Sequence, residues 1–396
     1  MRRAPLALVC WAALAPQARA TEAFDPAEAV ACETRRWARL ERLTDPDPRM
    51  EGDRHSAWTR HTDPEVVAAF GDAAPPSTTF LLHYAAGWDA PRRATPVLLV
   101  HGAGLSANHC FADRPIEQPH PGLAAHLARA GRAVFAVTFA HGHGDNFRQA
   151  EAVADAIARV RRVTGAKQVD LVAHSKGGMA CRIYLSDAGP AWATRYRGDV
   201  RRYVMLGAPN GGIDVGFAYP NLNYWILENR SSAPLTWTEG LYYGRWVEFG
   251  ERALTSGCYP GQLQMLARQG VGTTAARGQL DVATTYEGGR GQVSVAIGID
   301  RAIEAGGDVM ARLARKGIDP RVELAVLAGL SPWTLGLVGE RRGPSDGLLL
   351  VSSALATEAL TRRGARLLRA DLRAFNHLQL VYDPRANAWV EEALAP

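Results

Sequence analysis

From residue 78 onward, short unbroken apolar runs alternate with stretches whose apolar positions recur every three or four residues. Unbroken apolar runs are typical of strands buried on both faces, and the wider spacing is typical of helices. The pattern predicts strands at 78–84, 96–100, 133–139, 169–173, 200–206, 322–327 and 365–372. It predicts helices at 123–130, from Asp145 or Asn146 to beyond Val160, at 176–186, 301–316 and 386–395.

Strands of this kind that alternate with helices indicate an α/β fold, with a mostly parallel sheet covered by helices on both faces. The alternation stops between residues 214 and 292 and then resumes. Residues 21–75 are rich in charged residues and proline, and they are expected to form an N-terminal extension packed on the main body. The simplest organisation is one domain over 76–396 that carries an insertion at about 214–292.

The first twenty residues have the pattern of a secretory signal peptide. Arg2 and Arg3 precede an apolar run from 4 to 15, and small residues stand at Ala18 and Ala20. This pattern predicts cleavage after Ala20 and a secreted or periplasmic protein. The run is too short to span a bilayer. A lipid anchor on Cys10 is disfavoured because bulky Val9 precedes it and the apolar run continues beyond it.

Charge and cysteine content narrow the picture further. The formal net charge is +5, but the arginines are spread along the chain and alternate with acids. No basic block of the kind that binds nucleic acid is present, so no nucleic-acid partner is expected. Four cysteines remain after the expected cleavage, and they allow three pairings. A Cys110–Cys258 bridge is one hypothesis, while Cys181 lies on a helix expected to be buried.

The strongest chemical signal is the segment Ala173-His-Ser-Lys-Gly177, which joins a buried strand directly to a helix. In a nucleophile elbow the serine stands on such a turn with its hydroxyl exposed above the sheet. The positions two before and two after it must be small, because the two backbones converge there. Ala173 and Gly177 meet this requirement, so Ser175 is the expected nucleophile.

Acyl transfer also needs hydrogen-bond donors for the oxyanion that develops in the transition state. One expected donor is the backbone N–H of Lys176, which follows the nucleophile and lies at a helix N-terminus. The second should come from the loop after the strand at 96–100, where His101-Gly-Ala-Gly104 stands. We assign this donor to Ala103, with Gly104 as the alternative.

A serine hydroxyl needs an adjacent base. His377 follows the last strand, where the base belongs in the chain order serine, acid, histidine. Asp346, in the loop Ser345-Asp-Gly347, is the expected acid, and Glu340 and Asp371 are its rivals. The His141-Gly-His-Gly144 segment offers two possible metal ligands with no third nearby, so no metal is expected.

These motifs resemble the α/β-hydrolase superfamily, and within it the class 2 (Bacillus-type) secreted lipases. The resemblance rests on Ala-His-Ser-x-Gly-Gly at the elbow, Val-His-Gly-x-Gly at 100–104, Leu-Gly-Ala-Pro-Asn-Gly-Gly at 206–212 and Ser-Asp-Gly at 345–347. It covers about 95–213 well and 320–380 less well. Secreted polyhydroxyalkanoate depolymerases with the same elbow are also similar. The expected fold is therefore the α/β-hydrolase fold.

In this superfamily, an excursion after the strand at 200–206 usually covers the active site as a cap. Ten of the 31 aromatic residues lie between Phe217 and Tyr259. They line an apolar acyl site, form the insertion's own core, or do both. The candidate substrate contacts are Trp225, Trp237, Tyr242 and Trp246.

The resemblance implies a secreted serine carboxylic-ester hydrolase, a lipase or esterase, that acts on hydrophobic esters through an acyl-enzyme. No organic cofactor, metal or stable membrane anchor is expected. The alternatives are an extracellular polyester depolymerase, an acyltransferase, and a hydrolase-like binding protein without catalysis.

Overall fold

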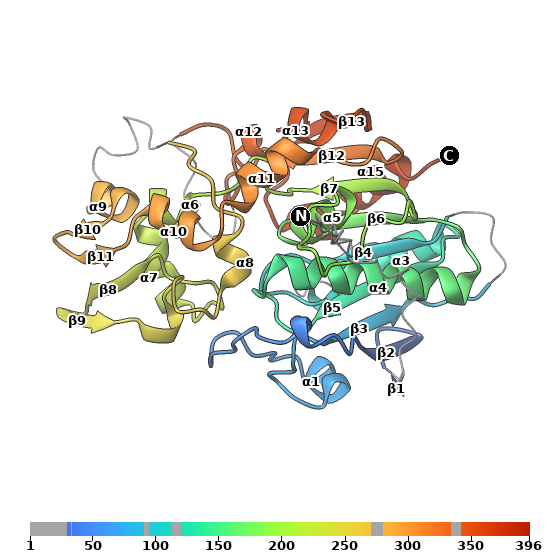
Figure 1. Cartoon of the computed structure of the whole chain (residues 1–396), viewed down its shortest axis with the longest axis horizontal. Coiled ribbons are helices and arrows are strands. Elements are labelled where there is room, and N and C mark those ends of the chain that lie inside the picture. The colour runs from blue at the N-terminus through green and yellow to red at the C-terminus, as the bar shows by residue number, and fades with distance from the viewer. Residues whose placement is uncertain (1–29, 33, 91–94, 113–119, 271–279, 334–341) are drawn as a thin grey trace, which may run out of the picture.

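The computed structural model describes residues 30–32, 34–90, 95–112, 120–270, 280–333 and 342–396. Two lobes lie side by side (Figure 1): a larger one built on a long central sheet, and a smaller one that interrupts it in sequence. The predicted signal peptide lies outside the described residues. No helix of the described part is both long and apolar enough to cross a membrane.

The central sheet explains the unbroken apolar runs. Its described part has nine strands in the order β1-β2-β3-β5-β4-β6-β7-β12-β13. Strands β5 to β13 run parallel, and β1, β2 and β3 are antiparallel to their neighbours. The strands are β1 Val30–Cys32, β2 Arg39–Thr44, β3 Thr79–Tyr84, β4 Val97–Val100, β5 Val134–Phe139, β6 Val169–His174, β7 Val200–Leu206, β12 Glu323–Gly329 and β13 Arg366–Arg373.

Helices cover both faces, so successive strand residues enter two different cores. One face carries α4 (Asn146–Thr164), α5 (Gly177–Leu185) and α11 (Val309–Lys316). The other face carries α2 (Ala107–Phe111), α3 (Leu123–Arg129), α14 (Gln379–Tyr382) and α15 (Pro384–Ala393). Short helices α12 (Val351–Ala354) and α13 (Glu358–Thr361) precede β13. The predicted parallel, doubly covered sheet is confirmed.

The interruption forms a second lobe, residues 214–305, with a small antiparallel sheet of order β10-β11-β8-β9. Its strands are β8 Trp237–Tyr242, β9 Arg245–Glu248, β10 Gly289–Arg290 and β11 Ser294–Ala296. Its helices are α6 Val215–Ala218, α7 Asn221–Glu228, η3 Gly250–Arg252, α8 Pro260–Leu263, α9 Val282–Glu287 and α10 Ile299–Ala305. This lobe has two apolar clusters of its own.

The prediction of a single helix over 301–316 is wrong. The structure has two helices there, α10 in the second lobe and α11 against the central sheet. Gly306 and Gly307 separate them, and Gly307 and Asp308 both have positive φ angles, of 77° and 51°. Such angles end a right-handed helix, and the apolar spacing alone did not reveal the turn.

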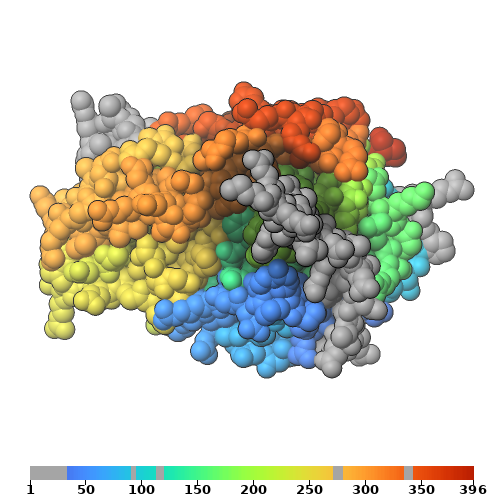
Figure 2. Space-filling view, in the orientation of Figure 1, coloured from blue at the N-terminus to red at the C-terminus, as the bar shows by residue number. Residues whose placement is uncertain are grey.

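The N-terminal segment is more than an extension packed on the body. Strand β2 pairs with β3 over six residues and so extends the central sheet. Residues beyond η1 (Pro48–Met50) and before α1 (Pro64–Phe70) reach the second lobe, where Arg54 pairs with Glu251 at 2.7 Å. Figure 2 shows this blue segment meeting the yellow lobe. The segment therefore joins the two lobes.

The Cys110–Cys258 bridge is wrong. Both thiols are free and buried, Cys110 in the core under the sheet and Cys258 in a core of the second lobe. Cys181 is also a free, buried core residue. Cys32 ends β1, and its side chain lies outside the described part.

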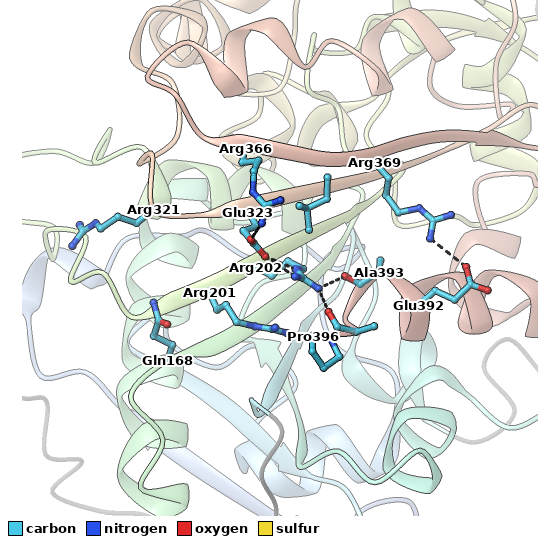
Figure 3. A pocket seen from close by; sticks show the side chains of 12 residues that line it. Gln168, Arg201, Arg202, Arg321, Glu323, Arg366, Arg369, Glu392, Ala393 and Pro396 are labelled. Carbon is cyan, nitrogen blue, oxygen red and sulfur yellow. Dashed lines mark hydrogen bonds and ion pairs between the residues drawn. The ribbon is translucent and has the colours of Figure 1, made fainter.

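A groove of about 500 Å³ lies at the amino ends of the parallel strands, and Figure 3 shows its arginines. These arginines already have partners: Arg202 bonds Glu323 and the carbonyl oxygen of Ala393, and Arg369 bonds Glu392. Ligands of open α/β sheets bind at the opposite, carboxyl ends of the strands. This groove is therefore an ion-paired seam between sheet and C-terminal helix.

Candidate active site

Ser175 stands on a sharp turn at the carboxyl end of β6, directly before α5. Its φ angle is 50°, a left-handed value that is strained for a serine, and its N–H donates to the carbonyl oxygen of Leu206. A Cβ at Gly177 would lie 2.4 Å from the carbonyl oxygen of His101. Only glycine fits there, so the strand and helix converge as the motif predicts.

The structure brings the three predicted side chains into one hydrogen-bonded row. His377 Nε2 lies 2.9 Å from Ser175 Oγ, and His377 Nδ1 lies 2.7 Å from Asp346 Oδ2. With the carboxylate accepting from Nδ1–H, Nε2 is the ring nitrogen that accepts the serine proton. The arrangement can generate a nucleophilic alkoxide and stabilise the imidazolium that forms.

Asp346 is held by its own loop. Its Oδ1 accepts from the backbone N–H groups of Leu348 and Leu349, at 3.1 and 2.7 Å. Its carbonyl oxygen accepts from the N–H of His377 at 2.9 Å. The rival Asp371 instead bonds Arg369 and the indole of Trp389. The rival Glu340 lies outside the described residues.

His174 has a position that the sequence did not reveal. Its imidazole is buried, and its Nε2–H donates to the backbone carbonyl oxygen of His377 at 3.0 Å. Burial holds its pKa well below 6.5, so it is a neutral donor. The only sequence signal was its place beside Ser175, because His377 lies two hundred residues away.

In the described part of the chain, the backbone N–H groups of Ala103 and Lys176 donate to no backbone carbonyl oxygen. The alternative donor is excluded, because the N–H of Gly104 is already bonded to the carbonyl oxygen of Gly142 at 3.2 Å. Ala103 lines the cavity beside Ser175. Both N–H groups are therefore available to donate to a ligand's oxygen as the expected oxyanion donors.

The His141-Gly-His-Gly144 loop lies behind the oxyanion loop. His143 Nδ1 accepts from Gln262 at 2.9 Å, and its Nε2–H donates to Ser232 Oγ at 3.1 Å. Burial keeps the pKa of His143 well below 6.5, so the ring is neutral. A Cβ at Gly104 would lie 2.6 Å from Ser232 Oγ. The loop thus holds the backbone at Gly104 against the second lobe through Gly142 and His143.

The side chain of Lys176 runs into the interior. It is 1% exposed, and its Nζ donates to Gln149 Oε1. Gln149 in turn donates to the carbonyl oxygen of His141 at 2.7 Å. Burial lowers the pKa of Lys176 to about 7. The elbow is therefore tied to α4 and to the loop behind the oxyanion site.

A cavity of about 310 Å³ opens above Ser175 and His377, between the two lobes. Its walls are mostly apolar residues of the second lobe, including Trp225, Ile226, Phe217, Leu222, Leu254 and Leu266. An apolar cavity with few polar groups at its base is typical of a small-molecule site.

Three of the four predicted aromatic contacts do not line this cavity. Trp237 is buried in the second lobe's own core, where its indole N–H donates to Thr285. Tyr242 bonds Glu228, and Trp246 is 41% exposed on β9 beneath the guanidinium of Arg290. Trp225 alone of the four lines it. The high number of aromatic residues in this segment does not show which of their side chains face the cavity.

Among the described residues, one group has three potential metal ligands within reach of each other: Asp45, Glu151 and Asp155. Glu151 already accepts from the backbone and hydroxyl of Thr194. The group lies between the end of β2 and α4, away from the cavity above Ser175. It has no place in the chemistry of the serine.

Residues 70–221 match a family model described as a domain of unknown function (DUF7379). Among solved structures, the chain is similar to the mature lipase BlEst2 of Bacillus licheniformis, at 15% identity and a TM-score of 0.47 over 80% of this chain and 98% of that one. It is also similar to a thermostable carboxyl esterase of Bacillus coagulans, at 13% identity and a TM-score of 0.42 over 80% and 95%.

The strand order settles the fold without those likenesses. Eight strands lie side by side from β2 to β13. If they are numbered 1 to 8 along the chain, their order across the sheet is 1-2-4-3-5-6-7-8, and strand 2 (β3) is antiparallel to both of its neighbours. The serine turn follows the fifth of them, at the carboxyl edge of the sheet. This chain has the α/β-hydrolase fold.

Proposed function

We propose that this protein is a serine carboxylic-ester hydrolase that acts on hydrophobic esters through an acyl-enzyme. The observation that carries the proposal is the row of Ser175, His377 and Asp346 at the base of an apolar cavity. Esterase and lipase names among the similar solved structures agree with it. The proposal includes export, because residues 1–20 have the pattern of a signal peptide.

In the first half-reaction, Ser175 Oγ attacks the ester carbonyl carbon while His377 Nε2 takes the hydroxyl proton. The carbonyl oxygen becomes an oxyanion that accepts from the N–H groups of Ala103 and Lys176. Collapse of this intermediate breaks the ester C–O bond. His377 gives its proton to the departing alcohol, and the acyl group remains on Ser175.

In the second half-reaction, water replaces the alcohol. His377 takes a proton from the water as it attacks the acyl carbon, and the same two N–H groups stabilise the second oxyanion. Collapse returns the proton to Ser175 Oγ and releases the carboxylic acid. Asp346 holds the imidazole in the required tautomer throughout and offsets its positive charge.

A panel of 4-nitrophenyl esters of increasing acyl length tests the proposal, with Ser175→Ala as the control. We expect hydrolysis by the parent protein, none above background by the variant, and labelling of Ser175 by a fluorophosphonate. Absence of both hydrolysis and labelling would leave a binding protein as the better account. Transfer of the acyl group to an added alcohol in preference to water would identify an acyltransferase.

The polyester alternative is separated by substrate form. Release of soluble hydroxy acids from a polyhydroxyalkanoate emulsion, at a higher rate than fatty acid release from triacylglycerol, would identify a depolymerase. Export is tested by sequencing the N-terminus of the mature protein, which should begin at Thr21.

A further inference from the structure

A second compartment, of about 390 Å³, lies beside the apolar cavity. The two share a wall made of Gly104, Leu105, His143 and Ser232, because these residues line both. The compartments therefore meet at the oxyanion loop. Ser175 lines the apolar cavity, and the second compartment begins on the other side of the shared wall.

Much of the compartment is formed by the N-terminal segment and the second lobe, the two parts of the chain that contain none of the catalytic motifs. The N-terminal segment contributes residues 57–63, and the second lobe contributes Arg230 and Ser232. The guanidinium of Arg252 stacks on Trp58 at 3.8 Å. The same group donates to the carbonyl oxygens of Ile226 and Ser231, both at 3.1 Å. These contacts hold the N-terminal segment against the turn that carries Arg230.

The compartment has an excess of positive charge. In the described part of the chain, neither Arg60 nor Arg230 has a carboxylate partner, although most other arginines here are paired. The one acid in the lining, Asp63, is already neutralised by Arg36 at 3.1 Å and bonded by Asn108 at 2.9 Å. Burial lowers the pKa values of His61 and His109, which are therefore neutral.

Arg230 stands in a strained backbone conformation. Its φ angle is 50°, a region that a residue with a long side chain rarely adopts, at the end of α7. A left-handed residue commonly ends a helix, and here the N–H of Ser231 donates to the carbonyl oxygen of Ile226 at 3.2 Å to close α7. Arg252 bonds the carbonyl oxygens of Ile226 and Ser231, on both sides of this turn, and so holds it in place.

We propose that this compartment is a substrate subsite for an anionic group, a carboxylate or a phosphate, bound by Arg60 and Arg230. Arginine is the side chain best suited to such groups, because its planar fork matches their oxygens. The inference rests on the proposed ester hydrolysis and narrows its substrate class. The preferred esters have a hydrophobic part for the apolar cavity and a negative charge on the far side of the oxyanion loop.

Matched substrate pairs test the inference. In the acyl arm, 4-nitrophenyl hydrogen adipate is compared with 4-nitrophenyl hexanoate, which replaces the carboxylate by a methyl group. In the alcohol arm, 1-hexanoylglycerol 3-phosphate is compared with 1-hexanoylglycerol. Each pair is measured on the parent protein, on Arg60→Gln/Arg230→Gln, and on Arg129→Gln, an exposed arginine of α3 outside the compartment.

We expect kcat/KM of the parent to favour the anionic member in at least one arm by about tenfold or more, since hydrogen bonds to charged groups are the strong ones. The double variant should lose this ratio, and Arg129→Gln should keep it. The arm that responds identifies carboxylate or phosphate as the ligand.

A ratio that is the same in parent and double variant in both arms would overturn the subsite, while hydrolysis of the neutral members would leave the proposed function standing. If none of the four esters is hydrolysed and Ser175 is not labelled, the proposed function itself is rejected. The neutral members also report on folding, because a misfolded variant loses both members of a pair.

Discussion

The imidazole of His174 donates to the backbone carbonyl oxygen of His377, 3.0 Å away. His174, which precedes Ser175 in the chain, thus holds His377, the residue that is hydrogen-bonded to Ser175. The two rings lie 4.8 Å apart between centroids, and both are buried. His174 is a positioning residue, since it acts on the serine only through His377.

Replacing His174 by leucine should lower kcat about tenfold and leave KM nearly unchanged. The substitution removes the hydrogen bond from His174 to the buried carbonyl oxygen of His377, a loss on the order of 1–3 kcal/mol, and allows the base to shift. His174→Gln retains an N–H donor and should recover most of the loss. Equal losses in both variants, or a loss confined to KM, would speak against positioning.

Asp346→Asn should reduce kcat by roughly 10³–10⁴-fold with little change in KM. An amide in place of Oδ2 offers a donor to His377 Nδ1 and so favours the wrong tautomer. The rate of fluorophosphonate labelling of Ser175 should fall in parallel. Near-parent activity would show that another acid, such as Glu340, supports the histidine.

Gly104→Ala should lower kcat by about 10²-fold, because the added Cβ would lie 2.6 Å from Ser232 Oγ and displace the N–H of Ala103. Gly165→Ala is the matched control. Both glycines have left-handed φ angles, 64° and 71°, but a Cβ at Gly165 meets nothing within 4 Å. Gly165→Ala should lower the free energy of unfolding by about 1 kcal/mol and leave kcat unchanged. Similar kinetics for the two variants would contradict the role of Gly104.

Lys176→Met should change the pH dependence of stability. The folded pKa of Lys176, about 7, lies below its unfolded value, so the unfolded state binds the extra proton between them. The parent therefore gains stability from pH 7 to about 10, by a few kcal/mol at most. The Tm of the variant minus that of the parent should be most positive at pH 7 and below, and should shrink toward pH 10. A difference that does not vary with pH would reject the buried, readily deprotonated amine.

Trp225→Ala should change the preferred acyl length, because this indole lines the cavity above Ser175. Trp246→Ala is the matched control, since its ring lies on an exposed strand of the second lobe. The 4-nitrophenyl ester panel should show a higher relative rate on longer chains for the first variant only. An identical shift in both would mean that the second lobe acts through its stability.

Local patterns predicted the central sheet well. The strand expected at 200–206 is β7, the elbow at Ser175 follows β6, and the chain order placed His377 and Asp346 after the later strands. These features are local, because burial on both faces demands an unbroken apolar run and converging backbones demand small residues. Residues that follow parallel strands lie together at the carboxyl edge of the sheet, so the chain order of Ser175, Asp346 and His377 predicts that they meet there.

Features that depend on contacts between distant segments were decided only by the tertiary structure. Periodicity showed neither that β2 extends the sheet, nor that Trp225 alone of four aromatics faces the cavity, nor that Cys110 and Cys258 lie in different cores. The bond from His174 to His377 and the meeting of Trp58 with Arg252 join segments about two hundred residues apart. Which side chains meet across such distances depends on how the whole chain packs, and no local spacing contains that information.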